Sequence, residues 1–199
     1  QRKVYETKLI EENPYVKVAF PDGAGREIIA QSHLVGRYNF QNIQTAIAIG
    51  RYFKVSGDRI KAAIENYIPN NNRSEVIRKG SNTILLDAYN ANPTSIENVI
   101  NGLDKIKNPN KIILLGDMLE MGKYSQQEHQ RIYDLAKSKK PKCIVLVGNE
   151  FGKIALAAGD KHFDIVEDAK EWWKKQNIEN AYVLIKGSRG IQLEKVISV

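Results

Sequence analysis

The sequence predicts an α/β protein in two parts: antiparallel strands with helices, then a mostly parallel sheet with helices on both faces. Two observations carry this prediction. Strand-like apolar runs alternate with helix-spaced patterns from residue 83 onward, whereas the first part has a hairpin signal and no such alternation. The loop 68–74, IPNNNRS, is rich in helix- and strand-breaking residues and separates the two sequence patterns. We therefore expect two domains, 1–72 and 73–199.

The first part predicts antiparallel strands followed by helices. The segment PDGAGR at 21–26 is a hairpin turn signal, because Gly23 and Gly25 can adopt positive φ angles at little cost. Apolar residues at helical spacing follow, and SGD marks the start of the second helix. The expected strands are 4–10, 15–20 and 27–31, and the expected helices are 40–53 and 58–67.

The second part predicts strands that alternate with helices. Such alternation implies a parallel sheet, because each helix returns the chain to the same end of the sheet. Capping-box spacing, Thr94 to Glu97 and Ser125 to Glu128, marks two of the helix starts. The expected strands are 83–86, 111–115, 143–147, 163–166 and 181–185, and the expected helices are 94–107, 125–139, 150–158 and 168–176.

Composition excludes several classes of protein. Of 199 residues, 42% are hydrophobic and 27% are charged, which is typical of a globular chain. The apolar runs are strand-sized, well short of the ~20 residues that a membrane-spanning helix needs, and no apolar segment follows the basic N-terminus as in a signal peptide. Cys143 is the only cysteine, so no internal disulfide can form and we expect a cytoplasmic protein.

Charge and histidine spacing argue against two other kinds of site. The net charge is +7, but Lys and Arg are scattered with no basic block, so we expect no nucleic-acid partner. A site for a phosphate-rich small molecule fits this surface better. His33, His129 and His162 lie far apart without metal-ligand spacing, and we expect all three at the surface.

Polar residues follow the ends of the expected parallel strands, where ligands bind in open α/β sheets. Asp87 ends one strand, Asp117 follows IILLG, and LIKG leads into KGSRG at 186–190. Asn92 can cap the next helix with Pro93 at its first position, which needs no ligand. Asp87 must be hydrated, paired or ligand-bound, and it can accept hydrogen bonds from both ribose hydroxyls. The residues alone leave its role open.

Phosphate binding has weak support within the chain. No G-x-x-x-x-G-K-[ST] loop is present, so the main phosphate cradle of an ATP-using enzyme would lie outside these residues. The segment KGSRG can form an anion-binding loop from backbone N–H groups with Lys186 and Arg189. A plain strand-to-helix turn explains it equally well.

Several ordered segments together resemble one family, the Mur ligases of bacterial cell-wall synthesis. They are GRYNFQNIQTAIA at 36–48, NNRSE at 71–75, LLDAYNANPTS at 85–95, LGDMLEMGKYSQQEH at 115–129 and VLIKGSRG at 183–190. The resemblance implies that 1–72 is the tail of the family's central ATPase domain. It also implies that 73–199 is the C-terminal Rossmann-like domain, and that the catalytic lysine loop, the magnesium-binding glutamate and the modified lysine lie outside this chain.

The resemblance also implies an activity, partners and site residues. The activity is ATP-dependent amide ligation through an acyl phosphate in peptidoglycan synthesis, with ATP and Mg²⁺ as cofactors and an expected monomer. The motifs fit best the member that joins D-alanyl-D-alanine to UDP-N-acetylmuramoyl-tripeptide. The implied ATP-binding residues are Asn39 and Asn42 by the adenine, Arg73 on the nucleotide and Asp87 on the ribose, with Tyr89 and Asn92; the implied dipeptide-site residues are Asp117, Glu120, Lys186, Ser188 and Arg189.

One position departs from the family pattern, and other functions stay open. Tyr38 stands where the family has a histidine before Asn39, so no imidazole role is expected there. A non-catalytic module that binds a nucleotide or peptide is the main alternative, because the phosphate loop is missing from these residues. A basic nucleic-acid-binding protein, which predicts steeply salt-dependent binding, ranks last.

Overall fold

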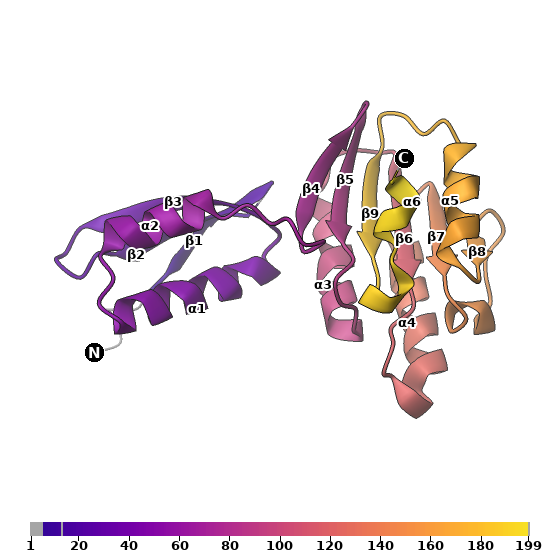
Figure 1. Ribbon diagram of the computed structural model, residues 1–199, viewed down its shortest axis with the longest axis horizontal. Helices are drawn as coiled ribbons and strands as arrows, with labels where there is room; N and C mark the ends of the chain where they lie inside the picture. Colours follow the sequence, from indigo (N-terminus) through magenta and orange to yellow (C-terminus); the bar gives the residue numbers. More distant parts are fainter. Residues whose placement is uncertain (1–5, 13, 199) are drawn as a thin grey trace. The chain divides into compact units, whose positions relative to one another are not determined.

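The computed structural model describes residues 6–12 and 14–198 and divides into two compact units, Gln1–Pro69 and Asn70–Val199 (Figure 1). The α/β class with a mostly parallel sheet is confirmed. Each unit has its own hydrophobic core, so each is described by itself.

The first unit is an antiparallel sheet of order β1-β2-β3 with two helices packed on it. Part of the expected strand 4–10 lies outside the described residues. Gly23 and Gly25 have φ angles of 94° and 102°, and the Asp22 carboxylate accepts hydrogen bonds from the turn backbone, which confirms the predicted hairpin turn. The elements are β1 (Lys8–Glu11), β2 (Tyr15–Pro21), β3 (Glu27–Val35), α1 (Tyr38–Tyr52) and α2 (Gly57–Asn66).

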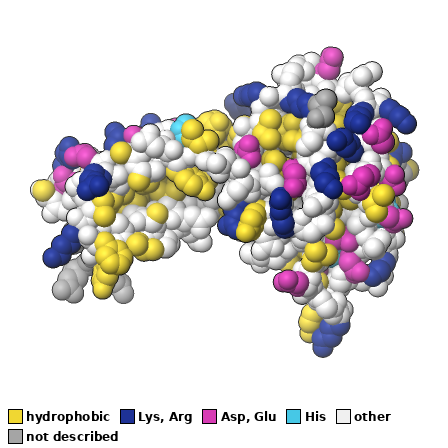
Figure 2. All heavy atoms as spheres, in the orientation of Figure 1, with side chains coloured by type: hydrophobic (Ala, Val, Ile, Leu, Met, Phe, Trp, Pro, Cys, Tyr) yellow, Lys and Arg dark blue, Asp and Glu magenta, His cyan; other side chains and the backbone are white. Residues whose placement is uncertain are grey.

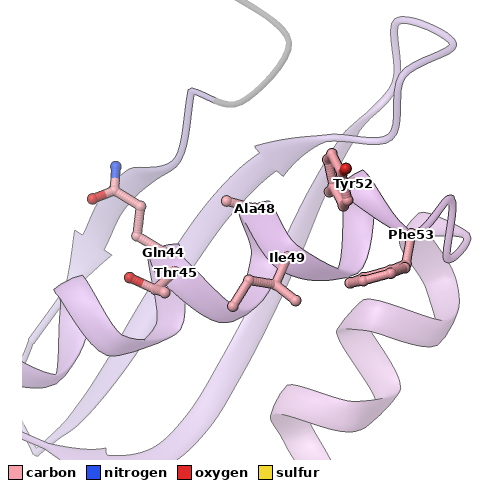
Figure 3. Close-up of a pocket in the computed structure, with 6 residues that line it drawn as sticks. All are labelled: Gln44, Thr45, Ala48, Ile49, Tyr52 and Phe53. Atoms are coloured by element: carbon pink, nitrogen blue, oxygen red, sulfur yellow. The ribbon is translucent and has the colours of Figure 1, made fainter.

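Helix α1 is apolar on two faces. Its inner face carries Ile43 and Ile47, which pack on β2, β3 and α2 in the core of the first unit. Its outer face leaves Ile49 54%, Tyr52 74% and Phe53 72% exposed. Figure 2 shows hydrophobic side chains at the C-terminal end of this helix, and Figure 3 shows the shallow hollow that they line with Gln44, Thr45 and Ala48.

The second unit is built on a sheet of order β4-β5-β9-β6-β7-β8. β4 pairs with β5 as an antiparallel hairpin, and every other neighbouring pair is parallel. The strands are β4 (Glu75–Lys79), β5 (Asn82–Asp87), β6 (Lys111–Gly116), β7 (Cys143–Val147), β8 (Lys161–Phe163) and β9 (Tyr182–Lys186). The helices are α3 (Pro93–Gly102), α4 (Ser125–Ser138), α5 (Val166–Lys174) and α6 (Glu194–Ile197), with short 3₁₀ helices η2 (Leu103–Lys105), η3 (Gly122–Tyr124), η4 (Phe151–Lys153) and η5 (Arg189–Ile191).

Helices cover both faces of this sheet, as the alternating pattern predicts. Figure 1 shows α5 and α6 on one face and α3 and α4 on the other. Successive strand residues point to opposite faces, so nearly continuous apolar strands are buried on both sides. The α5–α6 face buries Ile84, Leu86, Ile112, Leu114, Val145, Val147, Val183 and Ile185 of the strands.

Several predicted elements are wrong. The expected helix 150–158 contains just the short helix η4, because the backbone is already extended at Ile154, with φ −102° and ψ 159°. The expected strand 163–166 is β8 at 161–163, and α5 begins at Val166. The strand β4 was not predicted, because its apolar content is limited to Val76 and Ile77.

Both predicted capping boxes are also wrong. Helix α3 is capped two residues before Thr94, by Asn92, whose side chain accepts from the Ser95 N–H while the Ser95 hydroxyl accepts from the Asn92 N–H. This pair confirms the alternative cap with Pro93 at the first helical position. Ser125 does not cap α4, because its hydroxyl donates to Glu150 instead.

The two faces of α1 predict unequal effects of the same substitution. Ile47→Ala should destabilise the first unit by about 2–5 kcal/mol, because it leaves a cavity in the core. Ile49→Ala, on the exposed face of the same helix, should change stability by about 0.5 kcal/mol or less. Hydrogen exchange resolved to the peptides of β2 and β3 measures both variants within this unit. Equal losses of protection would contradict the assignment of the two faces.

Candidate functional site

The carboxyl ends of β5, β9 and β6 meet at one edge of the sheet. Asp87 pairs in register with Lys186, and Lys186 pairs with Leu115, so the loops after these strands start side by side. The β6 and β9 backbones approach closely there, since a Cβ on Gly187 would lie 3.1 Å from the Gly116 Cα atom. This is the edge where parallel α/β sheets bind ligands. Its polar residues therefore form the candidate site.

Asp87 and Lys186 form a buried ion pair at this edge. The Lys186 Nζ atom donates to Asp87 Oδ2 and to the Asn90 carbonyl oxygen, both at 2.8 Å, and lies 3.4 Å from the Asp87 carbonyl oxygen. The side chains of Lys186 and Asp87 are 2% and 13% exposed. The acceptors belong to the last residue of β5 and to the loop before α3, so the ammonium group fixes the start of that loop. The sequence grouped Lys186 with the dipeptide residues, whereas the structure brings it to Asp87.

Arg73 and Tyr89 stack beside Asp87. The Arg73 Cζ atom lies 3.7 Å from the centroid of the Tyr89 ring, and both side chains are exposed. The Ser74 N–H donates to Asp87 Oδ1 at 3.1 Å, which ties the segment carrying Arg73 to the carboxylate. Asn72 and Ser74 both have positive φ angles, 58° and 52°. Non-glycine residues in this region are uncommon and cluster at functional sites.

Asp117 is buried and fully engaged by the backbone. Its Oδ2 and Oδ1 atoms accept hydrogen bonds from the Glu150 and Phe151 N–H groups, both at 2.9 Å. Gly148 makes room for it, since a Cβ there would lie 2.3 Å from the Asp117 carboxyl carbon. The carboxylate therefore joins the end of β6 to the turn after β7, and it lies away from solvent.

The other expected dipeptide residues divide into buried and exposed groups. Ser188 is buried, and its hydroxyl accepts from the Leu119 N–H at 3.1 Å. Glu120 is exposed with a φ angle of 71°. Arg189 is exposed and donates to Glu194 at 2.6 Å. Glu120 and Arg189 thus lie on neighbouring loops of the edge with their charges accessible to a ligand.

His129 is buried, so its predicted surface position is wrong. Its side chain is 0% exposed, and its Nε2 atom accepts from the Met118 N–H at 3.0 Å. Helical spacing could have revealed this, because His129, Ile132, Tyr133 and Ala136 share the inner face of α4. His33 is exposed and His162 is partly buried.

Asn39 and Asn42 belong to the first unit. Asn39 is buried, and its Nδ2 atom donates to the Val35 carbonyl oxygen at 2.8 Å. Asn42 donates to Asn39 Oδ1 at 3.0 Å. The pair closes the junction between β3 and the first turn of α1.

Residues 6–12 and 14–198 contain no group of three or more His, Cys, Asp or Glu side chains placed to hold a metal ion. Within those same ranges, no helix has the length and apolar character needed to cross a membrane. On the face of the second unit that Figure 2 shows, basic and acidic side chains are interspersed.

The fold and the polar carboxyl edge define a ligand-binding domain of the parallel α/β class. A family model described as Mur ligase, glutamate ligase domain, matches residues 72–189. The chain therefore belongs to the Mur ligase family.

Curated relatives and solved structures agree with this membership. UDP-N-acetylmuramoyl-tripeptide–D-alanyl-D-alanine ligases of Treponema pallidum and Bacillus subtilis are 29% and 28% identical over 82% of this chain, which spans 37% and 38% of their lengths. A crystal structure of MurF from Acinetobacter baumannii is 26% identical, with a TM-score of 0.79 over 96% of this chain and 43% of that one. MurF from Thermotoga maritima in complex with ADP, 18% identical over 96% of this chain and 45% of that one with a TM-score of 0.77, shares the fold.

Removal of the Lys186 ammonium should destabilise the second unit strongly. Lys186→Met leaves the Asp87 carboxylate buried without its cation, and we expect a loss of about 3–5 kcal/mol. Urea unfolding followed by the fluorescence of Trp172 and Trp173, which pack against the core of this unit, measures the change. Lys195→Met is the control, because its ion pair with Glu167 is exposed and its unfolding midpoint should not move. A Lys186 variant as stable as the parent would refute the proposed role of the pair.

Proposed function

We propose that this chain is the C-terminal part of an ATP-dependent amide ligase that joins D-alanyl-D-alanine to UDP-N-acetylmuramoyl-tripeptide in peptidoglycan synthesis. The observation that carries the proposal is the cluster of Asp87, Arg73 and Tyr89 at the carboxyl edge of a Mur ligase domain. Residues 1–72 are then the end of the central ATPase domain, and 73–199 are the Rossmann-like domain. The names of the curated relatives support this substrate pair.

The nucleotide site is proposed around Asp87. Each carboxylate oxygen has two lone-pair positions, and Ser74 and Lys186 use one on each oxygen, so acceptor sites remain for ribose hydroxyls. The Arg73 guanidinium is fixed against Tyr89 and supplies a cation for phosphate oxygens. Asn92 caps the adjoining helix. For Asn39 and Asn42, which belong to the first unit, contact with the adenine stays a prediction from the family resemblance. A related MurF structure contains ADP, which supports a nucleotide as ligand.

The dipeptide site is proposed on the loops after β6 and β9. Glu120 can accept hydrogen bonds from the incoming amine, and Arg189 can bind the dipeptide carboxylate, since both side chains are exposed there. Asp117, Ser188 and Lys186 hold these loops and Asp87 in place from the interior. Exposed charges thus contact the substrates, and buried ones set their positions.

The reaction proceeds in two steps. The carboxylate of the UDP-linked peptide takes the γ-phosphoryl group of ATP and ADP leaves. The neutral dipeptide amine then attacks the acyl carbon, phosphate is expelled, and the nitrogen loses a proton as the amide forms. This chain's contribution is orientation, because it holds the nucleotide and the amine in line for the two transfers. Mg²⁺ bound with ATP would screen the phosphate charge. We further propose that the protein is a cytoplasmic monomer that acts on small molecules.

The proposal is tested with the complete gene product. We expect phosphate release from ATP that requires UDP-tripeptide and D-alanyl-D-alanine together. Arg73→Ala should raise the KM for ATP by about tenfold or more, because it removes charge-assisted contacts to the nucleotide. Arg78→Ala is the control, since Arg78 is an exposed residue of β4 that bonds Thr83.

The outcomes separate the alternatives. Absence of release with any amino acid or dipeptide acceptor would overturn the ligase. Nucleotide binding that persists without turnover would favour the non-catalytic binding module. An unchanged KM for ATP in the Arg73→Ala variant would keep the ligase and refute the proposed nucleotide contact.

A further inference from the structure

The loop that follows β6, residues Asp117–Tyr124, is held by consecutive backbone N–H groups. The N–H groups of its first three residues each donate to an acceptor from a different part of the second unit. After these three residues, Glu120 and Gly122 have positive φ angles. We call this segment the β6 loop. The bonds are Asp117 N–H to Val147 O at 3.0 Å, Met118 N–H to His129 Nε2 at 3.0 Å, and Leu119 N–H to Ser188 Oγ at 3.1 Å.

The hydrogen-bond partners of His129 define its tautomer. Nδ1 lies 2.7 Å from the carbonyl oxygen of Ser125, which can only accept, so Nδ1 carries the proton. Nε2 is then the free acceptor that the Met118 N–H requires. The Phe151 ring packs edge-on against the imidazole, with centroids 4.6 Å apart, and fixes its plane. The ring is therefore a neutral bridge between α4 and the start of the β6 loop.

The same residues superficially resemble a hydrolase triad. The Ser125 Oγ atom lies 3.3 Å from His129 Nδ1, and His129 Nε2 lies 3.8 Å from Asp117 Oδ1. However, the serine hydroxyl donates to Glu150 Oε2 at 2.5 Å, and both Asp117 oxygens accept backbone N–H groups. The ring nitrogen that faces the hydroxyl is Nδ1, which carries the proton, so the imidazole cannot act as the base that activates the hydroxyl. The cluster is therefore a structural network.

We propose that His129 is a positioning residue for the dipeptide amine. It fixes the backbone of Met118, two residues before Glu120, and so sets where the Glu120 carboxylate stands at the carboxyl edge. This inference rests on the proposed function, which assigns Glu120 to the amine. An apolar side chain at this position would fill the space but would leave the Met118 N–H buried without an acceptor.

Two substitutions isolate the acceptor atom. In His129→Gln the side-chain amide reaches the position of Nε2 and can accept from the Met118 N–H. In His129→Asn the shorter amide reaches only the position of Nδ1, so the Met118 N–H loses its partner. A role in packing alone predicts that the two variants behave alike, whereas positioning predicts rescue by Gln.

The first readout needs no activity. Lys123 is exposed in the β6 loop, and trypsin cleavage after it exposes a new N-terminus at Tyr124 that sequencing or mass spectrometry identifies. In the 199-residue chain, we expect His129→Asn to be cleaved there about tenfold faster than the parent, because the loop opens more often without its acceptor. His129→Gln should be cleaved within about twofold of the parent rate. Equal rates in the two variants would overturn the positioning role.

The second readout uses the complete gene product. His129→Asn should raise the KM for D-alanyl-D-alanine by about tenfold and leave the KM for ATP within about twofold, with His129→Gln close to the parent. A purely structural defect would lower the active fraction and move neither KM. Equal shifts in both KM values, or none, would overturn the inference. An inactive parent would overturn the proposed function and the amine subsite with it, while the cleavage rates would still report whether His129 holds the loop.

Discussion

The buried ammonium group of Lys186 is the interaction on which the carboxyl edge depends. A cation removed from water is stable only beside an anion and further acceptors, and Asp87 with the Asn90 carbonyl supplies them. The pairing fixes one Asp87 oxygen, and the Ser74 N–H fixes the other. Because Arg73 directly precedes Ser74, that hydrogen bond also sets the position of the Arg73 backbone. A buried charge thus determines where the proposed ligand-facing groups stand.

The other half of the edge is organised by neutral and backbone partners. The Asp117 carboxylate closes the turn at Glu150 and Phe151, and the imidazole of His129 accepts from the loop after β6. Neither arrangement places another cation in the interior. The only charge desolvated by these two arrangements is the Asp117 carboxylate, and two N–H donors compensate it. The exposed ends of both loops carry the charges proposed to contact substrate. In this unit, buried side chains hold the loops in place, and exposed side chains on the same loops are proposed to bind the substrate.

The sequence predicted what depends on local pattern. Apolar runs placed β5, β6, β7 and β9, and Asn92 with Pro93 marked the start of α3. The ion pair of Asp87 with Lys186 could not be predicted, because it requires β9 to lie between β5 and β6, and periodicity carries no strand order. The segment 150–158 has helical spacing, but its helix ends at Lys153 because the backbone is extended at Ile154, a change of direction that the spacing does not report. The buried position of His129 could have been predicted from the 3.6-residue period of α4. The surface prediction was wrong because it considered only the distances between the three histidines in the sequence.

The approach of Gly187 to Gly116 has a consequence for how this edge can change over evolution. A side chain at Gly187 would meet backbone atoms of Gly116 at 3.1 and 3.2 Å, and Leu193 at 2.9 Å. Gly116 already has the smallest side chain, so no compensating substitution there can make room. A side chain at Gly187 would therefore push against the Gly116 backbone, whereas one at Gly116 would meet the side chains of Ile191 and Leu193 at 2.9 and 3.0 Å. New ligand preferences must therefore arise on the outer parts of the loops, where Glu120 and Arg189 can be exchanged without disturbing the strands.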